Sequence, residues 1–319
     1  MIGDFGQLPP VINDAMYTQN LRYDSLSNDG MNAYKQFREV YKLDVVQRQS
    51  GDSEDQCHFR DILLRLRDGE TTINDWKTLT TRLTDSPNVD NRQFLDATFL
   101  LPRKADVDEV NYNKLRTLNS PIAIINAVHT GRNASKANSN IAKGLEARLL
   151  LARGARIMLR ANLWTEVGLV NGSMRIIQEI LYEEGQRPPS LPNVILIEFN
   201  NYTGPAITTT EGKKLVPILP IRQTWEAKSS VCSRLQLPIS LAWAITVHKS
   251  QGLTLPKAIV DFGEREYAAG LSFVAVSRIR ALNDLLFRPF SFERLQRIKK
   301  SKRLQDRKIE EKRLVSLIT

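Results

Sequence analysis

Polar side chains that suit phosphate follow an apolar run near residue 245. The run Leu241–Val247 predicts a strand. Within the longer segment Ala242–Leu255, a polar loop follows this strand. Its polar residues are Thr246, His248, Lys249, Ser250 and Gln251, followed by Gly252. Hydroxyls, an amide and an ammonium at the carboxyl end of a strand suit phosphate oxygens, and glycine permits a close backbone approach. A polar loop that merely caps a strand is the plainer alternative.

A second polar loop opens the sequence. Gly3–Val11 reads Gly-Asp-Phe-Gly-Gln-Leu-Pro-Pro-Val and contains a rigid Pro9-Pro10 step. The side chain of Gln7 can hydrogen-bond both a γ-phosphate and an attacking water. A Pro-Pro turn with one glutamine is weak evidence by itself, so this loop gains meaning only together with other segments.

Two arginines come at the ends of apolar segments. Arg278 follows Phe273–Ser277, and Arg48 follows Leu43–Val46, which predicts a short strand. A guanidinium fork can reach a phosphate and stabilise the charge that develops during phosphoryl transfer. Taken singly, each arginine is explained as well by an ordinary surface position.

The loop that normally cradles nucleotide phosphates is not found in these 319 residues. Its pattern is Gly-x-x-x-x-Gly-Lys-Ser/Thr. Gly212-Lys213-Lys214 lacks the hydroxyl after the lysine, and His248-Lys249-Ser250 lacks the preceding glycine. The sequence therefore carries later parts of a nucleotide-driven machine without the phosphate cradle.

Composition indicates an ordinary globular protein of two or three domains, with 42% apolar residues and a net charge of +10. No run of ~18 apolar residues predicts a membrane span, and no secretory signal is expected. Cys57 and Cys232, the only cysteines, fit a reducing compartment, and with three histidines they form no metal-ligand pattern. Ten Lys/Arg and three Asp/Glu fall within Arg294–Thr319. That basic stretch is either a solvated helical tail or a contact for a polyanion.

Periodicity predicts alternating helices and strands, then a β-rich segment from about residue 149 to residue 238, then α/β character again. Turns are predicted at Ser25–Gly30 and Gly51–Gln56. The predicted helices are Met31–Val40, Phe59–Arg67, Thr72–Arg82, Ala105–Leu118, Ala268–Arg278 and a charged helix from Arg294. Further predicted strands are Phe94–Leu101, Arg156–Leu159, Met174–Ile177, Val194–Phe199, Leu215–Ile218 and Ala258–Phe262. The order indicates a parallel sheet interrupted by a small inserted β-barrel.

Together and in this order, the four segments resemble motifs of the PIF-type (petite integration frequency) DNA helicases, RecD-like members of helicase superfamily one. The resemblance covers roughly residues 1–295, and the chain is also similar to the helicase portions of Helitron-type transposons. Gly154–Leu159 and Gly168–Gly172 are similar to the segments that begin the family's small Src-homology-like barrel.

The resemblance implies an α/β fold built on a RecA-like second motor domain. Its expected parts are a remnant of the first RecA-like domain at 1–40, the second RecA-like domain at 41–153 and 239–293, the barrel at 154–238, and a basic helical tail at 294–319. Residues 1–40 are expected to pack loosely for want of partners, whereas 41–290 are expected to fold alone.

The resemblance also assigns roles to residues. Gln7, Arg48 and Arg278 match catalytic positions, Arg278 being the arginine finger. Nucleotide contacts are implied for Asp4, Gln7, Arg48, Gln251, Gly252 and Arg278. DNA contacts are implied for Thr246, His248, Lys249 and Ser250. Gln7, Arg48, Lys249 and Arg278 are expected to meet around one cleft.

The implied activity is a 5′-to-3′ ATP-dependent DNA helicase using ATP and Mg²⁺ on single-stranded or forked DNA. Its implied settings are DNA repair, recombination, telomere or mitochondrial genome maintenance, or transposition, in the nucleus or mitochondrion. The sequence departs from the family in lacking the phosphate loop and the Mg²⁺-binding Asp-Glu pair, and in having Gly6 and Gln47 where bulkier residues are common.

These departures predict an N-terminally truncated chain that hydrolyses ATP only at background rates. The alternative is a non-catalytic remnant that binds single-stranded DNA or a partner. A third interpretation, a decayed product without a stable fold, also remains open.

Overall fold

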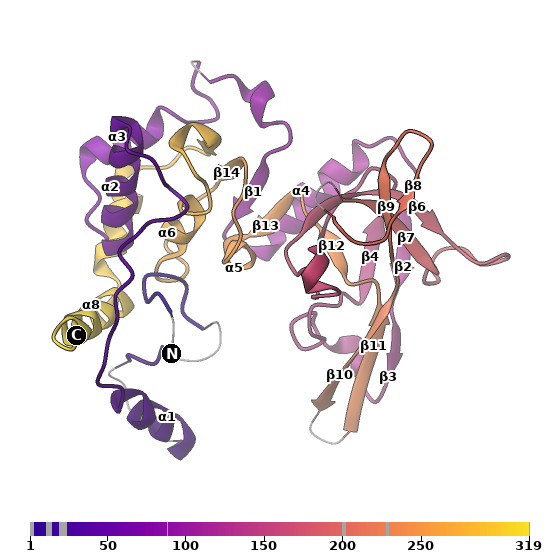
Figure 1. The fold of residues 1–319 in the computed structure, drawn as a ribbon, viewed down its shortest axis with the longest axis horizontal. Helices are drawn as coiled ribbons and strands as arrows, with labels where there is room; N and C mark the ends of the chain where they lie inside the picture. The colour runs from indigo at the N-terminus through magenta and orange to yellow at the C-terminus, as the bar shows by residue number, and fades with distance from the viewer. Residues whose placement is uncertain are drawn as a thin grey trace. The chain divides into compact units, whose positions relative to one another are not determined.

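A computed structural model describes residues 3–10, 15–18, 24–87, 89–199, 202–227 and 230–318 (Figure 1). Val11, which ends the first polar loop, lies outside the described residues. The chain divides into two compact units. One comprises Met1–Lys104 and Ile245–Thr319, and the other comprises Ala105–Ala244.

The first unit contains a four-stranded sheet in the order β13-β1-β14-β15. The strands are β1 (Thr98–Leu101), β13 (Ala244–Thr246), β14 (Ala258–Val260) and β15 (Leu285–Phe287). β1 pairs with β14 in parallel, and β14 pairs with β15 in parallel. β14 and β15 are buried along their whole length, as expected of parallel strands covered on both faces. The predicted parallel sheet is thus present.

Helices of the first unit begin and end at clear sequence signals. Ser53 caps α2 (Glu54–Asp68), which ends at Gly69 in the left-handed conformation. Thr72 and Asp75 form a capping box at the start of α3 (Ile73–Thr80). The other helices are α1 (Ser25–Lys35), α5 (Val247–Ser250), α6 (Leu271–Val276), α7 (Phe292–Gln296) and α8 (Lys302–Val315).

Several predicted boundaries are wrong. α1 begins at Ser25, inside the predicted turn, because the side chain of Asp24 caps it, and it ends at Lys35 rather than Val40. Leu43–Val46 forms no strand; Leu43 is 88% exposed, and no neighbouring strand pairs with this segment in the described structure. α2 begins at Glu54, within the predicted loop.

The predicted strand Leu241–Val247 is divided. β12 (Ile239–Leu241) belongs to the sheet of the second unit, and β13 starts three residues later. Val247 is already the first residue of α5, because the Thr246 hydroxyl caps that helix by accepting a hydrogen bond from the backbone N–H of Lys249. An apolar run alone does not reveal that the chain changes sheets within it.

The C-terminal helix packs against the N-terminal segment. Tyr34 is buried and its hydroxyl donates to Glu310 on α8, while Val40 and Ile318 form an isolated parallel bridge. Leu304 is buried on the same helix. The expectation that residues 1–40 would lack packing partners is therefore wrong at Tyr34 and Val40, whereas most other described residues of α1 are exposed. One face of α8 is buried, so the tail is not a fully solvated helix.

The second unit joins α4 (Lys104–Arg116) to mostly antiparallel strands. A six-stranded sheet has the order β12-β5-β6-β7-β9-β8, a three-stranded sheet β10-β11-β3, and a two-stranded sheet β2-β4. The strands are β2 (Ala123–Asn126), β3 (Val128–Thr130), β4 (Arg148–Leu151), β5 (Arg156–Leu159), β6 (Met174–Leu181), β7 (Val194–Glu198), β8 (Ile207–Thr208), β9 (Lys214–Ile218), β10 (Ile221–Ala227) and β11 (Ser230–Gln236). The four strands predicted between residues 156 and 218 are confirmed.

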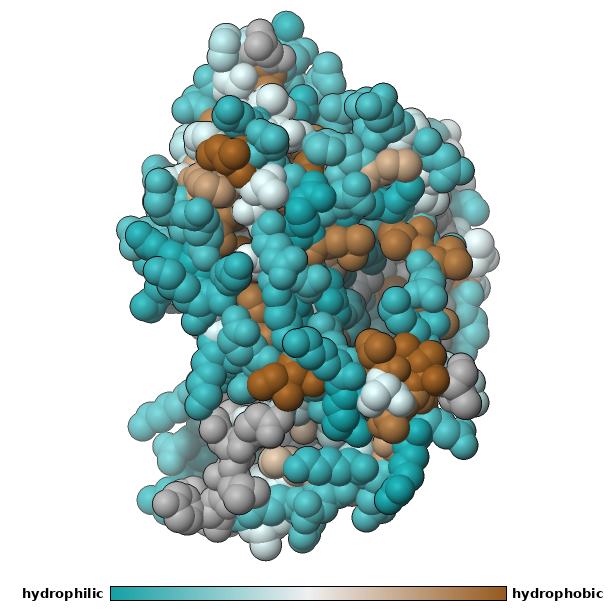
Figure 2. Space-filling view, turned by 90° about the vertical axis from the view of Figure 1, so that its left-hand side faces the viewer, coloured by the Kyte–Doolittle hydropathy of each residue, from teal (hydrophilic) through white to brown (hydrophobic). Residues whose placement is uncertain are grey.

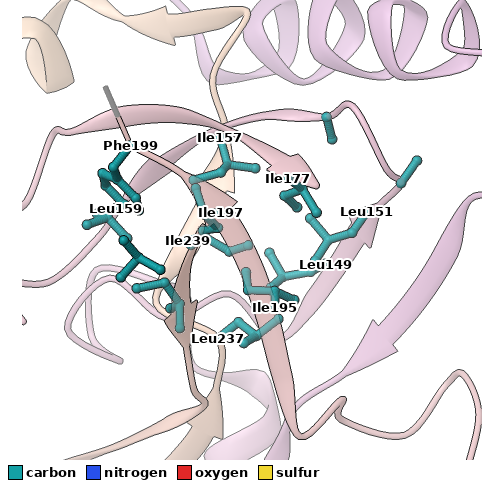
Figure 3. Close-up of a cluster of buried hydrophobic side chains, with 14 of the residues drawn as sticks. Leu149, Leu151, Ile157, Leu159, Ile177, Ile195, Ile197, Phe199, Leu237 and Ile239 are labelled. Carbon is teal, nitrogen blue, oxygen red and sulfur yellow. The ribbon is translucent and has the colours of Figure 1, made fainter. Parts of the chain in front are cut away.

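A branched aliphatic core fills the second unit (Figure 3). Ile157, Ile177, Ile195 and Ile197 are fully buried in it, and Leu151 of β4 joins them. Strands before residue 153 therefore share the core of the six-stranded sheet. The predicted domain boundaries at 153/154 and 238/239, and the Src-homology-like character of the insert, stay predictions.

Short 3₁₀ turns connect these elements at Asn91–Phe94, Ala134–Lys136, Thr165–Val167, Leu282–Asp284 and Arg297–Lys300. Hydrophilic residues cover most of the face in Figure 2, with hydrophobic ones in small separate groups. Within the described residues, no helix combines the length and hydropathy needed to cross a membrane.

A substitution of Asn111 tests how much its hydrogen bonds to the Ala244 backbone stabilise the second unit. The Asn111 amide nitrogen donates to the carbonyl of Ala244 and its amide oxygen accepts from the N–H of Ala244, both at 2.9 Å. Asn111→Ala leaves both buried backbone groups unpaired, so we expect a loss of about 2–4 kcal/mol in the free energy of unfolding, measured in urea. Asn113→Ala, exposed on the same helix, should change it by less than about 0.5 kcal/mol. Equal losses for the two variants would contradict the role of Asn111.

Candidate functional site

Arg48 and Arg278 meet at one short stretch of backbone in the first unit. Nη1 of Arg48 donates to the carbonyl of Ser277 at 2.8 Å, and Nε of Arg48 donates to the hydroxyl of Thr254 at 2.9 Å. Nη2 of Arg278 donates to the Ser277 hydroxyl at 2.8 Å, and its Nε to the Val274 carbonyl at 2.9 Å. Both guanidinium groups are thus held by neutral oxygens.

Neither arginine forms an ion pair within the described residues. Arg278 is only 3% exposed. Burial and then the like charge of Arg48 lower the pKa of Arg278 to about 10, while Asp4 opposes the shift. Burial also lowers the pKa of Arg48. Two desolvated cations near one another, without a carboxylate bound to either, favour the arrival of an anion.

Gln7 and Gln251 bring the two polar loops together. Nε2 of Gln251 donates to Oε1 of Gln7 at 3.1 Å, across 244 positions of sequence. The N–H of Gln7 bonds to the carbonyl of Asp4 at 3.1 Å, which closes a tight turn. The Asp4 carboxylate accepts from the N–H of Gly6 at 2.8 Å and from Arg67 at 3.1 Å. Asp4 therefore shapes the loop that carries Gln7.

The predicted DNA-contacting residues have different surroundings on α5. Ser250 is fully buried and its hydroxyl donates to the carbonyl of Val247. Thr246 caps the helix. His248 is partly buried, and this burial lowers the pKa of its imidazole. Lys249 is also partly exposed. Within α5 itself, His248 and Lys249 are the two polar side chains that are partly exposed.

Gly252 follows α5 with φ of +84° and open space around it. A Cβ there would meet no atom within 4 Å, so the glycine is needed for its backbone conformation rather than for room inside the fold. The exposed backbone beside it remains accessible to a ligand.

Sequence reasoning missed Gln49, Thr254 and Arg67. Gln49 is buried, and its amide donates to the carbonyls of Ser277 and Ile279 at 3.2 and 2.6 Å. It therefore fastens the segment that carries Arg48 to the segment that carries Arg278. Its place directly after Arg48 was a usable signal, whereas nothing in the sequence linked Arg67 to the first loop.

The donor set fits phosphate oxygens. Guanidinium groups bind phosphate in a fork geometry, and the Gln7 amide adds a neutral hydrogen-bonding group. No three His, Cys, Asp or Glu side chains of the described chain gather as ligands for a metal ion. These residues are therefore suited to the anionic part of a nucleotide.

Comparisons with known proteins identify relatives of the chain. It is 30% identical over 290 residues to the ATP-dependent DNA helicase PIF1 of Danio rerio, covering 89% of this chain and 39% of that protein. It is 31% identical over 294 residues to PIF1 of Homo sapiens, with the same two coverages. The chain thus spans less than half the length of these relatives. No protein-family model matches it.

Solved structures give the same fold. The crystal structure of Pif1 helicase from Candida albicans matches with a TM-score of 0.71 and 22% identity, over 97% of this chain and 67% of that one. Bacteroides Pif1 bound to ssDNA matches with a TM-score of 0.60 and 22% identity, over 92% and 63%.

The chain therefore has an α/β fold matching Pif1 helicase structures, with parallel and antiparallel sheets consistent with a RecA-like domain plus a β insert. It is a homologue of the Pif1-family ATP-dependent DNA helicases, at about 30% identity over most of its length.

Because the charge of Arg278 has no carboxylate partner among the residues that the structure describes, its removal should change the free energy of unfolding. A folded pKa below the unfolded value means that the cation is disfavoured in the fold at all pH values below about 10, including pH 7. We expect Arg278→Met to stabilise the chain by about 1–2 kcal/mol and to raise its Tm by about 2–6 °C at pH 7. The Val274 carbonyl keeps a partner, because the Ser277 hydroxyl also donates to it.

Arg65→Met is the matched control for this thermal melt. Arg65 makes two bonds, at 2.8 and 2.7 Å, to the buried carboxylate of Asp75, so its loss leaves an unpaired charge and should lower Tm. If both variants lowered Tm alike, Arg278 would be a structural residue.

Proposed function

We propose that this chain supplies the arginine side of the ATP site, and part of the DNA contact, in a Pif1-type helicase motor. The observation that carries the proposal is the pair of desolvated guanidinium groups of Arg48 and Arg278 at the Ser277 backbone. Homology to helicases that act on DNA with ATP supports the choice of ligand.

In the proposed reaction, water attacks the γ-phosphorus of ATP, the bond from that phosphorus to the β-γ bridging oxygen breaks, and ADP and inorganic phosphate leave. Arg48 and Arg278 bind its oxygens and stabilise the negative charge that grows on them in the transition state. The side chain of Gln7 orients the attacking water and exchanges its bond to Gln251 for a bond to the ligand. Asp4 and Gly252 shape the two loops that approach the nucleotide. Mg²⁺ and the phosphate cradle are not matched by residues in this sequence.

Single-stranded or forked DNA is the proposed second ligand. His248 and Lys249 are the proposed contacts to its phosphates, because they are the accessible polar side chains of α5. The hydrogen bond from Gln251 to Gln7 joins this helix to the nucleotide loop, so the two ligands would be coupled over a short path. We further propose 5′-to-3′ polarity and a role in DNA repair, recombination, telomere maintenance or transposition, in the nucleus or mitochondrion.

A non-catalytic DNA-binding role is the second candidate. It is favoured by the net charge of +10, much of it carried by residues 294–319. The two candidates differ in whether the arginines act on ATP, and that difference is directly measurable.

A joined enzyme tests the ATP site. The phosphate-loop domain of a Pif1 relative is fused ahead of Gly3, and ATP hydrolysis is measured with excess single-stranded DNA. We expect DNA-stimulated hydrolysis that falls by about 10³-fold or more in Arg278→Ala, because the finger stabilises transition-state charge. The 319-residue chain by itself should show background hydrolysis. Unchanged hydrolysis by Arg278→Ala in the joined enzyme would rule out the assigned role.

Binding of single-stranded DNA by the chain alone tests the α5 contact. We expect Lys249→Ala to weaken binding and to reduce the slope of log K against log salt by about 0.7, the value for one phosphate contact. Lys257→Ala is the control, since Nζ of Lys257 is held by the carbonyl of Gln93 at 3.1 Å. Equal effects of the two substitutions would show that Lys249 contributes only general charge.

A further inference from the structure

Arg67, at the end of α2, lies between two carboxylates from opposite ends of the chain. Its Nη2 donates to Asp4 at 3.1 Å and to Glu311 of α8 at 2.6 Å. Its Nη1 donates to Asp68 at 3.1 Å. The side chain of Arg67 is 20% exposed, and those of Asp4 and Glu311 are 37% and 29% exposed. These ion pairs are partly shielded from water, so they are stronger than fully exposed ones.

The first loop is in close contact with this guanidinium. A Cβ at Gly6 would overlap Nε of Arg67, so any larger residue there would displace the Arg67 side chain from this position. On the other side, a Cβ at Gly270 would lie 2.5 Å from the carbonyl of Gly6. Gly6, which stands where bulkier residues are common in the family, is therefore in close contact with both Arg67 and the start of α6.

Helix α8 is fastened to α2 by a second arginine. Arg307 is 3% exposed and donates to the Asp68 carboxylate at 2.6 Å and to the carbonyl of Arg67 at 3.0 Å. Its Nε lies 3.6 Å from Glu311, the same carboxylate that pairs with Arg67. The apolar anchor is Leu304, which packs against Gly69 at the end of α2. A small cavity lined by Phe5, Gly6, Arg67 and Arg307, among others, marks the place where the loop, α2 and α8 meet.

The two carboxylates also set the pKa of Arg67. Burial acts to lower its pKa, yet the bonds to Glu311 and Asp4 outweigh burial and leave the pKa above its usual value. The guanidinium therefore gains more from the two carboxylates than it loses by leaving water.

We propose that Arg67 is a positioning residue that ties the Gln7 loop to the C-terminal helix α8. The tether runs from Glu311 to Arg67, from Arg67 to Asp4, and from Asp4 to the N–H groups of Gly6 and Gln7. Gln7 is thereby held where it meets Gln251. The C-terminal segment, for which the sequence indicated only a basic charge, thereby helps to hold the loop that carries Gln7. The consequence for catalysis rests on the proposed function, whereas the tether itself does not.

Hydrogen exchange of the 319-residue chain tests the tether without nucleotide or DNA. In Arg67→Ala, backbone amides of a peptide covering residues 3–8 should exchange at least tenfold faster, because Asp4 loses the group that fixes it. Glu311→Gln should also speed exchange there, although residue 311 is at the other end of the chain. Arg67→Lys should not rescue, since one ammonium cannot match the planar fork between two carboxylates.

The matched control is Arg65→Ala on the same helix, which loses its bonds to Asp75 but does not touch the loop. It should lower Tm and leave exchange at residues 3–8 unchanged. Arg67→Ala combined with Glu311→Gln should be no faster than Arg67→Ala alone, because both changes break one chain of contacts.

Two outcomes would overturn the proposal. One is acceleration by Arg65→Ala as large as that by Arg67→Ala, which would mean only a general loss of stability. The other is an additive effect of the Arg67 and Glu311 changes. A joined enzyme with no ATP hydrolysis would count against the proposed function and would leave these exchange results standing.

Discussion

The arrangement of the first unit depends on holding two like-charged guanidinium groups, one buried and one partly buried, on the backbone around Ser277. Arg48 and Arg278 bind only neutral oxygens around Ser277, and each lacks a bound carboxylate among the described residues. Such a pair costs folding free energy, so the surrounding structure must hold it in place. Gln49, which donates to the carbonyls of Ser277 and Ile279 on either side of Arg278, helps to hold it.

Three other arginines of the same unit are paired with carboxylates. Arg65 binds Asp75, Arg67 binds Asp4 and Glu311, and Arg307 binds Asp68. The contrast separates arginines that support the fold from those left ready for an anion. In a protein with 45 Lys and Arg residues, this difference in partners says more about function than the net charge does.

The second unit is held together by an apolar core and by polar contacts to its backbone. Its core is a continuous group of Ile and Leu side chains from antiparallel strands, and its polar closure depends on pairs such as Asn111 with the Ala244 backbone (Figure 3). Homology to Pif1 helicases extends over both units, since the matched PIF1 of Danio rerio covers 89% of the chain. The similarity therefore extends to the second unit, although its strands carry none of the residues proposed to meet ATP.

The sequence by itself determined the residue types of both loops, the parallel sheet, the amphipathic α2 and the four barrel-like strands, because local periodicity and capping residues encode them. It did not determine that Leu43–Val46 would find no partner strand, that Ser250 would be buried, or that Tyr34 would meet Glu310. Those outcomes depend on contacts between residues hundreds of positions apart, such as Gln7 with Gln251 and Arg67 with Glu311. Only the tertiary structure decides them, since a side chain's partners follow from how the elements pack and not from its neighbours in sequence.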